Sequence, residues 1–482
     1  MQKIPRLMVA ALKGGAGKTL LTIGITAALT NRGLSIVTFK KGPDYIDAGW
    51  LGKAAGCHCR NLDSYLFDAD TLKTSFCAGA NRCDIAVIEG NRGLFDGVSA
   101  SGEYSSAELA KLLNCPVALV VDASKMTRTA AALVLGCKLL DPSVSIKAVI
   151  LNRVAGSRHE KTLRQSIEDH CSIPVIGCVN KLSLENFPQR HLGLLPLFEH
   201  AGANELIVEA AQVVERSIDL DRLVRIANTA DPFNCDYSVN LALKRDPSHV
   251  DLKIGVLRDS AFQFYYPENL SALSATGAKL VEISALESKP IPELDALYIG
   301  GGFPETHAEC LAKNTVFKNS LFEAVESGLP VYAECGGLMY LARELTIDNT
   351  TYPMVGVFDV GTVLERVPQG HGYMTVEVVV HNPFFPVGSV FKGHEFHYSY
   401  IKSENVRRSS YAFKVIRGHG INGAYDGIFR NNALGTYLHL HALGAQEWAQ
   451  HILNRAVQYH SAQKSDSTVR QWIPGPKSNH QI

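Results

Sequence analysis

The chain has 482 residues, of which 46% are hydrophobic and 20% are charged. This is the composition of a globular protein with apolar material for about two to four domains. Lysine plus arginine and aspartate plus glutamate each number 47, so the formal net charge is zero. A general nucleic-acid binder carries a basic excess, and no apolar run approaches the ~18 residues of a membrane span. We therefore expect neither a nucleic-acid partner nor a membrane partner.

The eleven cysteines are scattered along the chain, and the residues after Met1 lack the long apolar stretch of a signal peptide. This usage is typical of reduced thiols, so we expect a cytoplasmic protein without a disulfide framework. The close pair Cys57-His58-Cys59 has no second pair to complete a metal site, and we expect ordinary thiols there.

Residues 1–225 alternate between predicted strands and helices. The strands are short, β-branched and almost continuously apolar, as strands covered on both faces should be. They are expected at Pro5–Leu12, Ser35–Phe39, Asp84–Ile88, Pro116–Val121, Ile146–Leu151 and Pro174–Val179. Helical patterns over Leu20–Leu29 and Thr127–Leu140 lie between them. The pattern predicts a doubly wound, mostly parallel α/β sheet.

The periodicity fails over residues 226–250, which we interpret as a linker. Residues 251–460 then begin a second alternating region, which predicts a second α/β domain. Its first strands are expected at Leu252–Leu257, Lys279–Ile283, Ala296–Ile299 and Pro330–Ala333. The pattern is strand-rich after Val355 and helical over Gln446–Tyr459. The polar residues 461–482 are expected to form a flexible tail.

A glycine-rich loop follows the first expected strand. It reads Leu12-Lys13-Gly14-Gly15-Ala16-Gly17-Lys18-Thr19. Glycines let successive backbone N–H groups point at phosphate oxygens, at the positive end of the following helix. Lys18 would contact the outer phosphates of ATP, and the Thr19 hydroxyl would ligate Mg²⁺. The usual phosphate-loop motif, GxxxxGK[ST], has glycine at the position of Leu12, so this loop departs from it. The loop matches the variant motif KGGxGK[ST], in which Lys13 is an added lysine.

That variant resembles the phosphate loop of ParA- and MinD-type ATPases and of the nitrogenase iron protein. In those families the added lysine reaches the nucleotide of the partner subunit, so the resemblance implies a homodimer. A ParA-like ATPase switch is therefore an alternative function. It predicts neither a nucleophile domain nor dependence on glutamine.

Acidic residues follow the predicted strands at their carboxyl ends, where doubly wound sheets bind ligands. Glu89 comes directly after the third strand, at a position from which a carboxylate reaches Mg²⁺, and Asp44 and Asp47 follow the second. Asp96 lies in a glycine-flanked loop after Glu89. Taken singly, each acid is more readily a solvated loop residue or a helix cap than a ligand. Together they favour an ATP–Mg²⁺ site with a pocket for an acidic substrate.

Cys335 lies between an expected strand and two glycines that open a helix. This is the pattern of a nucleophile elbow, in which the thiol sits at a helix N-terminus and the helix dipole favours the thiolate. Gly301 and Gly302, which follow another strand, would form an oxyanion hole with Gly336. The base must be a distant histidine brought near by folding.

Two histidines two positions apart, His439 and His441, are candidates for that base. A further segment, Gly393-His394-Glu395-Phe396-His397, lacks one residue of the zinc-binding HExxH pattern. We interpret it as a polar loop that supports the site.

Nine segments in a fixed order resemble the cobyrinic acid a,c-diamide synthase family. They are FKKGPDYID, NLD, EGxxGLFDG, ILNRVAGSRH, RHLGL, GGGFPE, AECGGLMYL, GHEFHYS and GTYLHLH. The resemblance covers about residues 6–460. It implies a dethiobiotin-synthetase-like P-loop domain joined to a class I glutamine amidotransferase domain. It also implies a ligase that amidates acetate side chains of corrin precursors or related tetrapyrroles with ATP, Mg²⁺ and glutamine.

The resemblance implies that Cys335 attacks the glutamine carboxamide and that His439 accepts its proton. Leu440 and His441 stand where other class I amidotransferases carry a third, acidic triad member. The family generally lacks that member too, so none is assigned. In the first domain a substrate carboxylate would take the γ-phosphate of ATP before ammonia displaces phosphate.

The resemblance also implies roles for further residues of the first domain. The metal or phosphate candidates are Thr19, Asp44 and Glu89, and Asn152 resembles the position that contacts the nucleotide base. The positions that match those for substrate and intermediate are Tyr45, Ile46, Asp47, Asp63 and Asp96.

Lys13 and the pair Asn91-Arg92 depart from the family pattern, which usually lacks the added lysine and has apolar residues after Glu89-Gly90. The polar pair resembles the branch that amidates sirohaem or sirohydrochlorin, so that activity is an alternative. An arginine there would pair with a different arrangement of substrate carboxylates. A cobyric-acid-synthase-like enzyme shares the domain plan, but DYID and RHLGL favour the diamide synthase branch. Lys18, Cys335 and His439 are all present, which argues against an inactive homologue.

Overall fold

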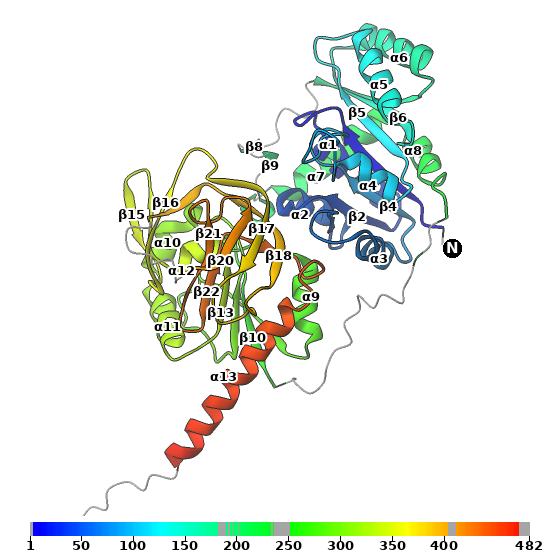
Figure 1. Cartoon of the computed structure of the whole chain (residues 1–482). Coiled ribbons are helices and arrows are strands. Elements are labelled where there is room, and N and C mark those ends of the chain that lie inside the picture. Colours follow the sequence, from blue (N-terminus) through cyan, green and yellow to red (C-terminus); the bar gives the residue numbers. More distant parts are fainter. Residues whose placement is uncertain are drawn as a thin grey trace, which may run out of the picture. The chain divides into compact units, whose positions relative to one another are not determined.

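The computed structural model describes residues 3–181, 189–190, 193–194, 196–200, 202–232, 235, 251–402 and 411–471. The chain divides into two units, Met1–Leu241 and Ala242–Ile482 (Figure 1). Most of the expected linker 226–250 lies outside the described residues. Within the described part of the chain, every helix is too short or too polar to cross a membrane.

The first unit is built on a seven-stranded sheet in the order β3-β2-β4-β1-β5-β6-β7. All of its neighbouring strands are parallel, which confirms the predicted sheet. The strands are β1 (Arg6–Ala11), β2 (Ile36–Lys41), β3 (Arg60–Leu62), β4 (Ile85–Glu89), β5 (Val117–Asp122), β6 (Ile146–Val154) and β7 (Val175–Asn180). Of these, β3 was not expected, because three residues are too few to form a recognisable apolar run.

Helices cover both faces of this sheet. They are α1 (Lys18–Asn31), α2 (Tyr45–Ala55), α3 (Ala69–Gly79), α4 (Ser106–Leu112), α5 (Thr129–Leu140), α6 (Ser157–Cys171), α7 (Ala203–Ser217) and α8 (Leu220–Ala227). Val9 of β1 belongs to the core shared with α1 and α7, whereas Met8 is buried outside that cluster, on the opposite face. The close packing of α1 on α7 (Figure 1) needs Gly24, since a Cβ there would lie 2.6 Å from the carbonyl oxygen of Ala210.

Short elements connect β7 to α7 along the chain. They are the antiparallel pair β8 (Gln189–Arg190) and β9 (Gly193–Leu194) and a 3₁₀ turn at Leu197–Glu199.

The second unit is built on a ten-stranded sheet in the order β11-β10-β12-β13-β22-β21-β20-β17-β18-β23. The strands from β11 to β22 in this order are parallel, and the rest pair antiparallel. Their bounds are β10 (Lys253–Leu257), β11 (Lys279–Ile283), β12 (Ala296–Ile299), β13 (Val331–Glu334), β17 (Gly370–Val378), β18 (Val390–His397), β20 (Tyr411–Arg417), β21 (Tyr425–Arg430), β22 (Ala433–Thr436) and β23 (His439–Leu440). The four strands expected before Val355 and the strand-rich region after it are therefore confirmed.

A four-stranded sheet and several helices complete the second unit. The sheet holds β15 (Thr350–Pro353), β14 (Ala342–Ile347), β16 (Phe358–Leu364) and β19 (Ser399–Lys402). The helices are α9 (Pro267–Ala275), α10 (Ala308–Lys313), α11 (Thr315–Glu326), α12 (Gly336–Leu341) and α13 (Trp448–Gln471), with a 3₁₀ turn at Pro304–His307. Successive residues of β12 alternate between two cores: Ile299 belongs to one and Tyr298 to the other.

Helix α13 is longer than predicted. It was expected to end at Tyr459, before a flexible tail at 461–482, but it continues to Gln471. The reason is the absence of a helix breaker, because the first proline or glycine after Trp448 is Pro474. Residues 472–482 lie outside the described part of the chain.

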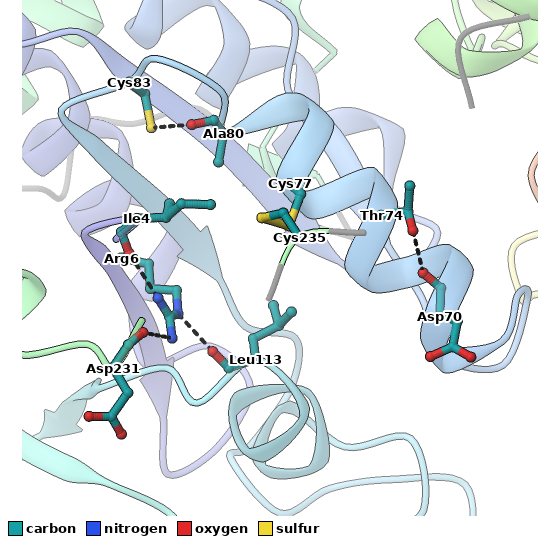
Figure 2. The surroundings of a disulfide bond; sticks show 10 residues. All are labelled: Ile4, Arg6, Asp70, Thr74, Cys77, Ala80, Cys83, Leu113, Asp231 and Cys235. Carbon is teal, nitrogen blue, oxygen red and sulfur yellow. Dashed lines mark hydrogen bonds between the residues drawn. A yellow bond between two sulfur atoms is a disulfide. The ribbon is translucent and has the colours of Figure 1, made fainter. Parts of the chain in front are cut away.

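A disulfide joins Cys77 of α3 to Cys235, with the two Cα atoms 5.7 Å apart (Figure 2). This corrects the expectation that the cysteines are all reduced thiols. The two residues are 158 positions apart, so their spacing carried no signal. Nearby, the fully buried Arg6 donates hydrogen bonds to the carbonyl oxygens of Leu113 and Asp231 (2.7 and 2.9 Å), which fixes the chain shortly before Cys235.

Candidate active sites

The glycine-rich loop joins β1 to α1, and two of its glycines have left-handed backbone angles: φ is 72° at Gly15 and 84° at Gly17. Asn152 Nδ2 donates a hydrogen bond to the carbonyl oxygen of Ala16 at 2.8 Å, and a Cβ on Gly17 would collide with that amide. Among the described residues, no side chain caps the first turn of α1, which leaves its N–H groups for an anion such as phosphate.

Lys18, Thr19 and Glu89 lie together at the carboxyl ends of β1 and β4. Lys18 Nζ is 3.7 Å from Glu89 Oε1, and the Thr19 hydroxyl donates to the same oxygen at 2.7 Å. Glu89 is fully buried, and its Oε2 has no hydrogen-bond partner within the described residues. A hydroxyl beside an unsatisfied carboxylate oxygen is a donor set that fits Mg²⁺, which takes its other ligands from phosphate and water.

Lys40, near the end of β2, is a site residue that the sequence analysis missed. Its side chain has no exposed surface, and its Nζ lies 2.6 Å from Asp47 Oδ2, 3.0 Å from Glu89 Oε1 and 3.9 Å from Asp44 Oδ2. Burial alone lowers the pKa of Lys40, but Asp47, Glu89 and Asp44 outweigh burial and raise it above the ordinary value. Its position at the end of an apolar strand could have identified Lys40 in the sequence. A lysine in such a strand is buried, and a buried lysine is usually paired with a carboxylate.

Asp44 and Asp47 lie at the start of α2. Asp44 caps the helix: its Oδ1 accepts hydrogen bonds from the N–H groups of Ile46 and Asp47 at 2.9 and 3.0 Å. Burial and the charge of Asp47 raise the pKa of Asp44. Burial acts in the same direction on Asp47, but Lys40 holds the pKa of Asp47 below its ordinary value.

The loop after β4 places Asn91 and Arg92 beside the loop after β2. A Cβ on Gly42 would lie 3.0 Å from Asn91 Nδ2, so the two loops are in contact. Arg92 has a left-handed φ of 50° and an exposed side chain. Asp96 is also exposed, and its Oδ2 accepts a hydrogen bond from the N–H of Gly93 at 2.9 Å.

The remaining substrate candidates lie close to β2 in the fold. Tyr45 and Ile46 form the half-buried first turn of α2. Asp63 is fully buried, and its Oδ1 accepts hydrogen bonds from the N–H groups of Tyr65 and Leu66 at 2.8 and 3.2 Å. The carboxylate of Asp63 therefore also stabilises the turn after β3.

Lys13, the added lysine, extends toward solvent. Its side chain is 66% exposed, and its Nζ lies 3.5 Å from Asp122 Oδ2. Asp122 also pairs with Arg153 at 2.8 Å. A long cation with this exposure remains accessible to a second molecule.

No group of three or more His, Cys, Asp and Glu side chains that could hold a metal ion occurs among the described residues. Cys57 and Cys59 are free thiols, the first exposed and the second buried.

In the second unit, Cys335 has the backbone of a nucleophile elbow. Its φ of 47° and ψ of −99° place a non-glycine residue in a conformation that is rarely populated. The N–H of Cys335 donates to the carbonyl oxygen of Thr436 at 2.7 Å. Gly336 lies against Gly302, because a Cβ on Gly336 would be 3.0 Å from the Gly302 nitrogen. The two backbone segments expected to form an oxyanion hole are thus adjacent.

The environment of the Cys335 thiol differs from the expectation that a helix N-terminus favours the thiolate. Burial raises the pKa of Cys335, and the negative charge of Glu305 raises it further. The hydrogen bond from the Gly336 backbone acts in the opposite direction on the pKa of Cys335 but does not offset these effects. The thiol therefore needs a base.

The structure distinguishes between the two candidate histidines. The His439 ring lies against Gly301, where a Cβ would be 2.5 Å from Cε1, and it stacks on His394 with ring centroids 4.7 Å apart. His441 contacts Tyr266 instead, and burial lowers the pKa of His441 to about 3. The loop of Gly301 and Gly302 lies against both His439 and the residue after Cys335, and this favours His439 as the base. His441 has the surroundings of a neutral core histidine.

The segment Gly393–His397 belongs to strand β18 rather than to a loop. His394 pairs directly with His439 across the β18–β23 ladder. Glu395 Oε2 accepts a hydrogen bond from the N–H of Gly420 at 2.7 Å, so this carboxylate holds backbone. Burial lowers the pKa of His394, and His439 lowers it further. A neutral histidine therefore supports the ring of the candidate base.

Two protein-family models match the chain. The CobQ/CobB/MinD/ParA nucleotide binding domain matches residues 7–194, and the CobB/CobQ-like glutamine amidotransferase domain matches residues 253–447. The fold and both sites therefore define a protein with a nucleotide-binding domain followed by a glutamine amidotransferase domain. The interpretation as a ParA-like switch alone is wrong, because it predicts no second domain of this kind.

Curated relatives match over nearly the whole chain. The cobyrinate a,c-diamide synthase of Magnetococcus marinus is 42% identical, over 93% of this chain and 96% of the relative. The enzymes of that name from Archaeoglobus fulgidus and Methanosarcina barkeri are 40% and 35% identical, over 94% and 95% of this chain and 98% and 97% of their own lengths. The chain belongs to the cobyrinate a,c-diamide synthase family, which confirms the resemblance found in its motifs.

Proposed function

We propose that the protein is a cobyrinate a,c-diamide synthase, a ligase that converts tetrapyrrole acetate carboxylates into amides with ATP and with ammonia from glutamine. One observation carries the proposal: a single chain holds two sites. In one, Lys18 of the phosphate loop lies beside Glu89. In the other, Cys335 lies in an elbow, and the glycine loop that contacts this elbow also contacts His439. The names of the family relatives support the substrate.

In the amidotransferase unit, Cys335 Sγ attacks the carboxamide carbon of glutamine while His439 takes the thiol proton. The N–H groups of Gly301, Gly302 and Gly336 stabilise the oxyanion of the tetrahedral intermediate. Collapse of the intermediate breaks the C–N bond, and His439 returns the proton to the leaving nitrogen, which departs as ammonia. Water then hydrolyses the thioester to glutamate and restores the thiol.

In the nucleotide-binding unit, an oxygen of the substrate carboxylate attacks the γ-phosphorus of ATP, and ADP leaves. Ammonia then adds to the carbon of the acyl phosphate, phosphate leaves with its bonding electrons, and the proton lost from nitrogen passes to the departing phosphate. Lys18 and the N–H groups of residues 14–17 bind the phosphates, and Asn152 is the proposed contact of the nucleotide base. Thr19, Asp44 and Glu89 would hold Mg²⁺, which would neutralise charge on the transferred phosphoryl group.

The proposed tetrapyrrole pocket lies at the carboxyl ends of β2 and β4. Its residues are Tyr45, Ile46, Asp47, Asp63, Asn91, Arg92 and Asp96. Arg92 would pair with a substrate carboxylate, because its guanidinium is exposed and can form two parallel hydrogen bonds. The same exposed arginine favours sirohydrochlorin or sirohaem as the second candidate substrate.

We propose that the protein acts as a homodimer in the cytoplasm, where ATP is available. The exposed Lys13 supports the dimer, because a side chain that is 66% exposed is accessible to a nucleotide bound by a partner subunit.

Mass spectrometry of the reaction products tests the function. The protein is incubated with ATP–Mg²⁺, glutamine and, in separate reactions, cobyrinic acid and sirohydrochlorin, each with and without metal. Amidation replaces OH by NH₂, so the mass shift counts the amides formed. A doubly shifted cobyrinate is the expected result. A mass shift of sirohydrochlorin with unreacted cobyrinate would support the second candidate substrate instead. If neither substrate shows a mass shift, both candidate functions are contradicted.

A further inference from the structure

Glu334, the residue before Cys335, is a buried carboxylate beside the candidate base. It ends strand β13, has no exposed surface, and its Oε2 lies 3.5 Å from His439 Nδ1. His439 is 105 positions further along the chain and is itself 2% exposed. The sheet brings the two together, because β13 pairs with β22, which leads into the segment that carries His439.

Three donors from three strands hold the Glu334 carboxylate in place. The hydroxyl of Tyr298 on β12 donates to Oε2, the hydroxyl of Tyr332 on β13 donates to Oε1, and the N–H of Leu440 on β23 donates to Oε1, each at 3.1 Å. Burial and the charge of Glu334 raise the pKa of both tyrosines well above the ordinary value, so they remain neutral donors. A carboxylate has about four acceptor positions, which leaves one for His439.

The surroundings on the other side of His439 are neutral or belong to the reaction. His394 from β18 stacks on the ring, and its lowered pKa keeps it uncharged. The Cys335 thiol, beside Glu305, carries the proton to be removed. A buried charge is costly unless it gains a charged partner, and His439 becomes that partner when it takes the proton.

We propose that Glu334 is the positioning residue for His439: it receives the Nδ1–H of the ring, which leaves Nε2 as the proton acceptor, and it stabilises the imidazolium formed when the Cys335 thiol is deprotonated. This inference rests on the proposed glutaminase half-reaction. The carboxylate that is missing after His439 in the sequence is thus supplied by the strand that carries the nucleophile.

Glu334→Gln tests the role, since it keeps the shape of the side chain and removes its charge. We expect kcat for glutamine hydrolysis to fall about 10²–10⁴-fold, as when the acid of a Ser-His-Asp triad becomes an amide. The KM for glutamine and the amidation driven by free ammonia should stay close to wild type. The acid limb of the kcat/KM profile should move to lower pH, because His439 loses the charge that favours its protonated form. Glu334→Asp should restore the position of this limb and part of the rate.

Glu268→Gln is the matched control. Glu268 Oε2 lies 3.6 Å from His441 Nε2, so the same replacement removes a carboxylate beside the other histidine. Glutamine hydrolysis by this variant should equal that of the wild type.

A Glu334→Gln variant with wild-type kcat, or with a lower kcat and an unmoved acid limb, would overturn the inference. If the Glu334→Gln variant also loses ammonia-driven amidation, it has misfolded. The Glu334→Asp variant is then used to test the inference. A folded Asp variant with lower kcat and unchanged KM supports the role, and one with wild-type kcat overturns it. A wild-type chain that releases no ammonia from glutamine overturns the proposed function together with the inference, whereas normal hydrolysis by Glu334→Gln overturns the inference alone.

Discussion

Lys40 Nζ lies 3.0 Å from Glu89 Oε1, and both side chains are completely buried. The same amine lies 2.6 Å from Asp47 Oδ2 and 3.9 Å from Asp44 Oδ2, so Lys40 is the cation that all three carboxylates beside the phosphate loop share. A buried carboxylate that loses its partner is left with the full cost of its desolvation. Lys40 thus maintains the charge balance of the site.

Lys40→Met is therefore expected to lower the free energy of unfolding by about 3–5 kcal/mol. Urea denaturation followed by circular dichroism measures the change. Lys13→Met is the control: its side chain is 66% exposed, and its loss should change stability by about 0.5 kcal/mol or less. Equal effects of the two replacements would contradict the pairing.

Cys335→Ala should abolish amidation driven by glutamine, because no thioester can form, and should spare amidation driven by ammonia. Product formation with each nitrogen source, measured by mass spectrometry, checks this. The buried thiol Cys115 offers a control, since Cys115→Ala removes a thiol from the other unit and should preserve both activities. Loss of both activities in Cys335→Ala would refute the separation of the two sites.

Lys18→Ala should eliminate amidation from either nitrogen source, because the charge that develops on the phosphoryl group loses its neutralising cation. Basal release of ammonia from glutamine should persist, since Cys335 and His439 are unchanged. A coupled ammonia assay beside product analysis separates the two activities. Full amidation by this variant would contradict the assignment of the phosphate loop.

Replacing the polar pair by Asn91→Leu and Arg92→Leu should shift the preference between cobyrinate and sirohydrochlorin, because the exposed guanidinium no longer pairs with a substrate carboxylate. The ratio of kcat/KM for the two substrates is the readout. Arg82→Leu is a matched control: Arg82 is also an exposed arginine with a left-handed backbone (φ 64°), and it lies before the other end of β4. An unchanged ratio of kcat/KM would show that Arg92 does not determine substrate preference.

Cys235→Ser should lower the stability of the first unit by about 2–5 kcal/mol, because the crosslink closes a long loop and restricts the unfolded chain. Thermal unfolding with and without reductant measures this. The wild type should respond to reductant and the variant should not. A wild type that ignores reductant would show that the bond does not contribute.

Six of the seven strands in the sheet of the first unit were predictable, because parallel strands covered on both faces are continuously apolar, as in Ile85–Glu89. Helix α2 was not, because Gly49 and Gly52 interrupt its pattern and Asp44 supplies the missing start as a cap. Gly52 is needed there: a Cβ would lie 2.8 Å from the carbonyl oxygen of Cys57.

The candidate site residues at strand ends, such as Glu89 and Cys335, could be predicted because parallel strands present their carboxyl ends at one edge. Lys40 and Glu334 could not, because the role of a buried charge depends on partners distant in sequence. Glu89 lies 49 positions after Lys40, and the histidine beside Glu334 is equally beyond the reach of a local pattern.

The disulfide also determines how mechanical load passes through the first unit. Cys235 is the last described residue before the chain leads on toward the second unit, and it is covalently fixed to α3. Tension arriving from that direction is transmitted through Cys77 into α3, and helix α8, which precedes Cys235 in sequence, is shielded from it. Reduction would redirect the same tension onto the hydrogen bond between Arg6 and the carbonyl oxygen of Asp231 and then onto α8, so the order in which the elements detach depends on the redox state of one bond.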